Sequence, residues 1–360
     1  MHTLNRRKLL KFAGLSAAAA AWPLATAAQT PAFPRGAIIR TLLKDYQPEE
    51  LAGGATLFHE HLSLANDFMD KFRAASAAVQ AANGVRPAAP AAAPAGGAAT
   101  PARPPQSGPT KDLDAMVADV NKAKAAGVAC MVDAGHPDMG RDIEFARAVA
   151  MKSGMPIVAC AGFYSQPYYP ASIATMSEDG IVQALLDQIA ANPTGAIGEI
   201  GSWDEMTKDE RKVFRAVGRV AAQTNLPVIT HTGIPGKAAI EQLNILEDAG
   251  VNPKSVVIGH LGNLVDANVY VHKTLCRRGA FIGFDRQGGN GDAQQVPMVL
   301  ALLEAGFADN LLFSADASSG YDKTLTAFIP KLKAAGADAA TLNRIMVDNP
   351  RRFLAFVPKA

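Results

Sequence analysis

The sequence predicts an α/β fold, a single (β/α)8 (TIM) barrel, on three observations. The chain has 360 residues, 49% of them hydrophobic, which is enough for one large core. Eight short apolar segments alternate with longer amphipathic ones, the pattern of strand–helix units around a parallel sheet. Histidines and carboxylates follow several of the apolar segments, and barrel enzymes carry their active sites at these strand ends.

The predicted strands are short and almost continuously apolar, as expected for strands buried on both faces. They are Thr56–Phe58, Val128–Val132, Pro156–Ala161, Ala196–Ile200, Leu226–Thr230, Ser255–Ile258, Ala280–Phe284 and Leu311–Ser314. A doubly wound sheet is the alternative architecture. It would usually carry a glycine-rich phosphate turn after the first strand, and none is present.

The helices between these strands are amphipathic. Thr207–Thr224 shows the pattern most fully, with a capping box formed by Thr207 and Glu210. Its apolar stripe comprises Val213, Phe214, Val217, Val220 and Ala221. A helical extension from Leu62 to Ala82 follows the first strand, and the other helices are expected to start near Asp112, Gly140, Glu178, Gly236, Leu264, Asp292 and Asp322.

Residues 1–28 are predicted to be a signal peptide of the twin-arginine type. Adjacent Arg6 and Arg7 precede the apolar run Phe12–Leu24, and Ala25-Thr26-Ala27 forms an A-x-A cleavage site. A membrane anchor is disfavoured because the run is short and Pro23 interrupts it. We therefore expect the twin-arginine export machinery to deliver a periplasmic protein whose single barrel domain spans residues 29–360.

The rest of the composition limits the possible partners. Removing the four cations of residues 1–28 changes the formal net charge from +2 to about −2, so nothing favours nucleic acid or an anionic membrane.

Residues 81–110 form an Ala/Pro-rich insertion that is predicted to be disordered. It is either a lid over the site or a neutral insertion, and the second is favoured. Three separated cysteines are expected to be buried free thiols: Cys130, Cys160 and Cys276.

His59-Glu60-His61 closes the first strand. Residues i and i+2 of a strand point to the same face, so both imidazoles can hold one metal ion while Glu60 faces away. Four more strands end on polar residues with the same potential: Glu199, His231, His260 and Asp316.

Together these six residues suit a pair of divalent cations. His59, His61 and Asp316 would hold one cation, His231 and His260 the other, and Glu199 would bridge them. Imidazole with carboxylate fits zinc best, and manganese, cobalt or iron are also compatible. Two dications, two carboxylates and a bridging hydroxide sum to about +1, which suits negative charge developing on a carbonyl or phosphoryl oxygen.

In order and context, these motifs resemble the phosphotriesterase family of the amidohydrolase superfamily. The resemblance also rests on Gly140-Arg141-Asp142-Ile143, Gly162-Phe163-Tyr164 and Asn349-Pro350-Arg351-Arg352-Phe353-Leu354. It implies a binuclear metal centre ligated as above and attack by a metal-bridging hydroxide on a small ester, lactone or organophosphate. It also suggests a homodimer.

Two positions depart from the phosphotriesterase pattern. Glu199 stands where phosphotriesterase proper has a bridging carboxylated lysine, and a glutamate can bridge without modification. Arg286 stands where true phosphotriesterases have a histidine for a proton relay, which arginine cannot replace at neutral pH. The pair Asp285-Arg286 resembles lactonase and esterase relatives, so a lactonase or esterase is favoured over a paraoxon-type phosphotriesterase.

Three residues are candidates for catalysis. Asp316 is expected to be both ligand and general base. Tyr164 would touch the hydroxide or the leaving group, and Arg286 would contact substrate. His136 follows the second strand and is favoured as a solvated loop residue, while His272 receives no role. The alternative functions are a phosphodiesterase or amidase on the same centre, and a catalytically silent periplasmic metal-binding barrel.

Overall fold

The computed structural model describes residues 31–82, 110–233, 236, 238–264 and 266–359. The signal-peptide prediction for residues 1–28 lies outside the described residues, and so does all of the predicted insertion except residues 81, 82 and 110. No helix among the described residues is long and apolar enough to span a bilayer.

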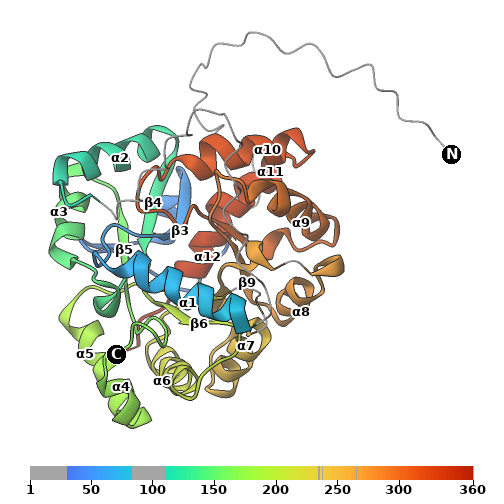
Figure 1. Ribbon diagram of the computed structural model, residues 1–360. Coiled ribbons are helices and arrows are strands. Elements are labelled where there is room, and N and C mark those ends of the chain that lie inside the picture. Colours follow the sequence, from blue (N-terminus) through green and yellow to red (C-terminus); the bar gives the residue numbers. More distant parts are fainter. Residues whose placement is uncertain (1–30, 83–109, 234–235, 237, 265, 360) are drawn as a thin grey trace, which may run out of the picture.

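Eight parallel strands form the predicted (β/α)8 barrel, with the helices outside them (Figure 1). In spatial order the strands are β3 (Ala55–Glu60), β4 (Val128–Asp133), β5 (Ile157–Ala161), β6 (Ala196–Ser202), β7 (Val228–Thr232), β8 (Val256–Ile258), β9 (Phe281–Phe284) and β10 (Leu311–Phe313). The first strand is bonded through its backbone to the segment that follows the last strand. The Asp316 N–H donates to the His59 carbonyl at 3.1 Å, and the His61 N–H donates to the Ala317 carbonyl at 2.9 Å.

Glu60 strengthens this closure. Its buried carboxylate accepts the Ser314 hydroxyl at 2.7 Å and the backbone N–H groups of Ala315 and Ala317 at 2.9 and 2.8 Å. As the alternation of a strand requires, it points away from the face that His59 and His61 share. Glu60 thus joins β3 to the segment that carries Asp316.

The helices follow the strands in chain order. They are α1 (Phe68–Ala82), α2 (Leu113–Ala125), α3 (Ile143–Ser153), α4 (Ser172–Thr175), α5 (Glu178–Ala191), α6 (Lys208–Thr224), α7 (Ala239–Asp248), α8 (Tyr270–Arg278), α9 (Asp292–Glu304), α10 (Ile329–Ala334), α11 (Ala339–Asn343) and α12 (Asn349–Leu354). The capping box predicted for α6 is present, because Thr207 and Glu210 exchange side-chain to backbone hydrogen bonds of 3.1 and 2.8 Å. A small antiparallel pair, β1 (Ile39–Arg40) and β2 (Asp45–Tyr46), precedes the barrel and was not predicted.

Three helix starts differ from the prediction. α1 begins at Phe68 rather than Leu62, because the Leu62 N–H donates to Asp133 and the Ala65 N–H to the Met139 carbonyl, which holds the intervening residues as a loop. α8 begins at Tyr270 rather than near Leu264, after left-handed residues that interrupt helical geometry. The helix expected near Asp322 opens as a π-helical turn, Thr324–Phe328, before α10.

Side chains of the strands alternate between two apolar layers. The layer inside the barrel includes Phe58, Val132, Val158, Ile229 and Leu312, and Phe353 of α12 packs against it. The other layer lies between the strands and the surrounding helices. Cys130, Cys160 and Cys276 are buried free thiols, as predicted. Because apolar side chains fill the inside of the barrel, the polar side chains lie at the carboxyl ends of the strands.

Candidate metal centre

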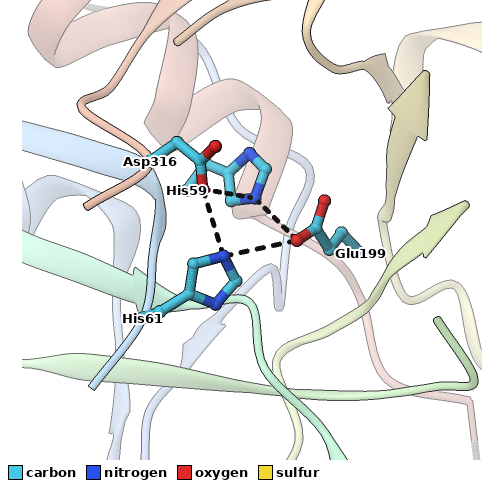
Figure 2. A group of neighbouring side chains, drawn as sticks. All are labelled: His59, His61, Glu199 and Asp316. Carbon is cyan, nitrogen blue, oxygen red and sulfur yellow. Dashed lines mark ion pairs between the residues drawn. The ribbon is translucent and has the colours of Figure 1, made fainter. Parts of the chain in front are cut away.

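One half of the polar cluster comes from β3 and from the turn after β10. Figure 2 shows His59, His61, Glu199 and Asp316 directed toward one another. His59 Nε2 and His61 Nε2 each lie 3.3 Å from Glu199 Oε1. Asp316 Oδ1 lies 3.1 Å from His61 Nε2 and 3.7 Å from His59 Nε2. Four side chains thus direct a nitrogen or an oxygen toward one small volume.

The other half comes from the ends of β7 and β8 and shares Glu199. His231 Nδ1 lies 2.9 Å from Glu199 Oε2, and His260 Nε2 lies 3.3 Å from the same oxygen. Glu199 therefore presents one carboxylate oxygen to each pair of histidines. This is the arrangement expected of a carboxylate that bridges two cations, so the structure brings all six predicted ligands together.

The donor set fits divalent cations chemically. His59 Nε2 is buried with no hydrogen-bond partner, although buried polar nitrogens are normally satisfied. His231 Nδ1 and His260 Nε2 lie only 2.6 Å apart, so without a cation one of the two rings must donate a proton to the other. Cations at these atoms would satisfy the orphan nitrogen and take the place of that proton. Imidazole and carboxylate ligands are the kind that zinc and related ions take.

Without cations, the cluster holds protons instead. Burial alone would lower the pKa of His61, but Asp316 and Glu199 outweigh it through hydrogen bonds and charge, and raise that pKa to about 9. Burial and the neighbouring His260 lower the pKa of His231 to about 4. Against burial, the charges of His59 and His231 keep the pKa of Glu199 well below its usual range. A metal ion would have to displace the proton on His61.

Asp285, directly after β9, supports two of the histidines from behind. Its carboxylate accepts His260 Nδ1–H at 2.7 Å and the His260 backbone N–H at 3.0 Å. Its second oxygen also lies 3.4 Å from His59 Nδ1. A carboxylate on Nδ1 fixes the tautomer of an imidazole and leaves Nε2 free to bind metal. Sequence reasoning gave Asp285 no role of its own, although its position after a strand matches that of Asp316.

Arg286 and Asp316 form an ion pair at the edge of the cluster. Arg286 Nε donates to Asp316 Oδ2 at 2.9 Å, while Asp316 Oδ1 faces His61. His260, Arg286 and Asp316 all have left-handed backbone conformations, with φ of 61°, 59° and 48°. Such conformations in non-glycine residues cluster at functional sites, where surrounding contacts hold them in place.

Tyr164 contacts the cluster directly, whereas His136 lies outside it. The buried Tyr164 hydroxyl lies 3.0 Å from His231 Nδ1, so it borders the cluster. His136 is fully buried, and its prediction as a solvated loop residue is wrong. Its Nε2 lies 2.9 Å from the Glu199 carbonyl, and its Nδ1 contacts Asp138, which also accepts the Tyr164 N–H at 2.8 Å. His136 is thus a buried anchor for the Glu199 backbone. His272 Nε2 lies 2.8 Å from the Leu261 carbonyl oxygen, and His272 is not part of the cluster.

A cavity of about 480 Å³ opens onto the cluster. α1 crosses the front of the barrel in Figure 1 and supplies its apolar wall through Phe68, Met69 and Phe72. The Phe72 ring lies 6.1 Å from the His231 ring and 5.2 Å from the Trp203 ring, so α1 packs directly over the site. The segments after β9 and β10 supply most of the other lining residues, which are largely polar, and the Arg286 guanidinium lies over the Phe72 ring, 5.5 Å from its centre.

The chain is thus a (β/α)8 barrel with a cluster of histidines and carboxylates that could bind metal at the carboxyl ends of its strands. The chain belongs to the phosphotriesterase family, which it matches over residues 46–354. It is a hydrolase of that family, as the sequence resemblance implied.

Individual relatives cover much of the chain. The phosphotriesterase homology protein of Escherichia coli is 30% identical over 255 residues, which are 65% of this chain and 86% of that protein. Its crystal structure, described as complexed with phosphate in the active site, superposes with a TM-score of 0.70 and covers 86% of this chain and 100% of that one. The N-acetyltaurine hydrolase of Rattus norvegicus is 26% identical over 350 residues, which are 88% of this chain and 98% of that protein.

Proposed function

We propose that this protein is a binuclear metal-dependent hydrolase that acts on the carbonyl group of a small ester or lactone. The observation that carries the proposal is the position of Glu199, with one carboxylate oxygen facing each histidine pair at the floor of a cavity. His59, His61 and Asp316 would hold one cation, and His231 and His260 the other. Divalent cations bound there would supply Lewis acidity toward the substrate and lower the pKa of a water molecule.

Asp316 and Tyr164 can supply the proton transfers that the reaction needs. Despite burial, the charges of His59, His61 and Arg286 keep the pKa of Asp316 far below its usual range. Its carboxylate is therefore ionised at neutral pH and can accept a proton as the nucleophile attacks. Burial raises the pKa of Tyr164, so its hydroxyl stays protonated and can donate to a substrate oxygen.

Arg286 favours carbonyl substrates over organophosphates. Its guanidinium donates a hydrogen bond of 2.9 Å from Nε to Asp316. Burial alone would lower the pKa of Arg286, but the negative charges of Asp316 and Asp285 outweigh burial and raise it, so the guanidinium keeps its proton. It can orient Asp316 or donate to a carbonyl oxygen, but it cannot pass a proton onward. A relay from Asp316 through this position, which a triester hydrolase of the phosphotriesterase type would use, is therefore blocked.

Amide hydrolysis is the second candidate. The relative matched over 88% of this chain is named N-acetyltaurine hydrolase, and its named substrate carries a carboxamide. An amide presents the same electrophilic carbonyl as an ester, so the same site residues would serve. The two differ in the leaving group, because an amine must gain a proton as it departs.

A substrate panel on metal-loaded protein tests these alternatives. Protein stripped by a chelator and reconstituted with Zn²⁺, Mn²⁺ or Co²⁺ is assayed on 4-nitrophenyl acetate, γ-butyrolactone, N-acetyltaurine and paraoxon. We expect metal-dependent turnover of ester or lactone, and a kcat lower by about 100-fold or more in Asp316→Asn. Paraoxon as the preferred substrate would contradict the carbonyl assignment. Metal binding without turnover on any substrate would leave a catalytically silent barrel.

We further propose that the protein is exported through the twin-arginine pathway and works in the periplasm. The support is the sequence of residues 1–28, with Arg6 and Arg7 ahead of a short apolar run. Fractionation with N-terminal sequencing tests this. A mature periplasmic chain starting near residue 28 is expected, and a chain retained in the cytoplasm after Arg6→Lys with Arg7→Lys supports the pathway. Periplasmic delivery of that double variant would contradict it.

A further inference from the structure

Lys323 brings an uncompensated positive charge to the substrate cavity. It lines the cavity beside Ser318 and Arg286, and within the described part of the chain no carboxylate forms an ion pair with it. Arg286 differs, because its charge is directed to Asp316 at 2.9 Å. The carboxylates among the described lining residues are Glu199 and Asp316, and both belong to the proposed metal centre. The charge of Lys323 therefore remains available to a ligand.

The backbone is shaped to let the Lys323 side chain lie along the rim. Gly288, after β9, has φ of +81°, and a Cβ atom there would come within 2.8 Å of Lys323 Cβ. Gly320, after β10, has φ of +67°, and a Cβ atom there would lie 2.6 Å from Lys323 Cε and 2.9 Å from its Nζ. Gly288 thus makes room for the base of the Lys323 side chain, and the end of that side chain lies against the backbone of Gly320.

The part of the cavity lining that α1 supplies is apolar. Phe68, Met69 and Phe72 of α1 face the cavity, and the ring of Tyr168, 4.8 Å from the Phe68 ring, helps to hold α1 in place. The residues of α1 in the lining therefore suit an apolar group, and Lys323 suits a negative charge. With two divalent cations in place, the cations of the site would also outweigh its carboxylates, which favours a negatively charged substrate further.

We propose that Lys323 is a specificity-determining residue that binds an anionic group, a carboxylate or sulfonate, on the substrate of this hydrolase. The proposal rests on the proposed function and names its substrate class: an ester or amide with an apolar portion against α1 and an anion remote from the reacting carbonyl. The lysine contacts the anion as a point charge and takes no part in bond breaking.

The test compares aryl acetates that differ in the charge of the substituent opposite the acetoxy group, and turnover is followed as release of acetate. Metal-loaded wild type is assayed on 4-acetoxybenzoate, 4-acetoxybenzenesulfonate and the neutral methyl 4-acetoxybenzoate. We expect wild type to prefer the anionic esters, and Lys323→Met to lose about 10- to 100-fold in kcat/KM on them, mainly through KM. The same variant should change less than about 3-fold on the neutral ester. Lys323→Arg should restore most of the loss, because it keeps the charge.

Lys152→Met provides a matched control, since Lys152 is an exposed lysine of α3 that pairs with Asp114 outside the cavity. It should leave all three substrates unaffected. Equal effects of Lys323→Met on charged and neutral esters, or no effect on either, would overturn the proposal. Lack of metal-dependent turnover on every ester and on γ-butyrolactone would instead refute the proposed function, so the two failures are distinguishable. A preference for only one of the two anions would support the proposal and narrow the class.

Discussion

Replacing Asp285 by asparagine should weaken metal binding although Asp285 touches no metal. In wild type its carboxylate accepts two hydrogen bonds from His260, at 2.7 and 3.0 Å, and faces His59 Nδ1 at 3.4 Å. An asparagine of the same shape offers one acceptor and one donor. Its NH2 group must therefore face either an N–H of His260 or the His59 nitrogen, and the negative charge behind both ligands is removed.

The size of the effect follows from the hydrogen bonds that the Asp285 carboxylate accepts. A hydrogen bond to a charged group contributes about 1.5–3 kcal/mol, and removal of a carboxylate behind a metal-binding histidine typically costs about 10- to 100-fold in metal affinity. We expect the zinc dissociation constant of Asp285→Asn, measured by competition with a chromogenic chelator, to rise by about that factor. Asp348→Asn is the control, because Asp348 pairs with Arg351 outside the histidine cluster. An unchanged zinc affinity in Asp285→Asn would refute the supporting role of this carboxylate.

Two further predictions concern proton transfer and pH. Arg286→His removes the ion pair with Asp316 and restores a group that can pass a proton, so the ratio of paraoxon to ester turnover should rise by about 10-fold or more; an unchanged ratio would show that Arg286 does not set it. In metal-free protein the pKa of His61 is raised from 6.5 to about 9, so its contribution to folding stability is present below pH 6.5 and is lost as pH rises through 9. Thermal melts of metal-free protein should show that loss, while His61→Asn should flatten it. Calorimetric zinc titrations near pH 7 in buffers of different ionisation enthalpy should also show proton release, and its absence would contradict a protonated His61.

The barrel and its proposed ligands could be predicted because both depend on local sequence. Apolar segments of strand length recur with helical segments between them, and the carboxyl ends of parallel strands meet at one rim. Any polar residue that ends such a strand therefore has a known neighbourhood. Glu199 and Asp316 are far apart in the chain, and both lie near His61 for this reason alone.

The supporting residues were harder to predict, because their roles depend on which atoms face them. Asp285 and Arg286 are adjacent in sequence, but the Asp285 carboxylate accepts a hydrogen bond from His260, and the Arg286 guanidinium donates one to Asp316. His136 follows a strand as the ligand histidines do, yet its ring bonds the Glu199 backbone and lies outside the cluster. Sequence spacing gives the rim on which a residue lies, but only the fold determines its direction there.

The position of α1 also depends on tertiary contacts. A helix after the first strand was predicted, but its start at Phe68 depends on bonds from Leu62 and Ala65 to distant residues. Its packing over the site depends on aromatic contacts such as that between Phe72 and Trp203. Neither set of contacts leaves a periodic pattern in the sequence, so the apolar wall of the cavity could not be foreseen.

Metal content tests the central claim most directly. Folded protein that is reconstituted with zinc and freed of excess zinc should contain about two zinc ions per chain, measured by inductively coupled plasma mass spectrometry. Glu199→Ala should retain fewer than about one, because both cations lose their shared carboxylate. Glu210→Ala, which removes another buried carboxylate outside the cluster, should retain both. Folded wild-type protein without zinc, or Glu199→Ala with two ions still bound, would contradict the binuclear site.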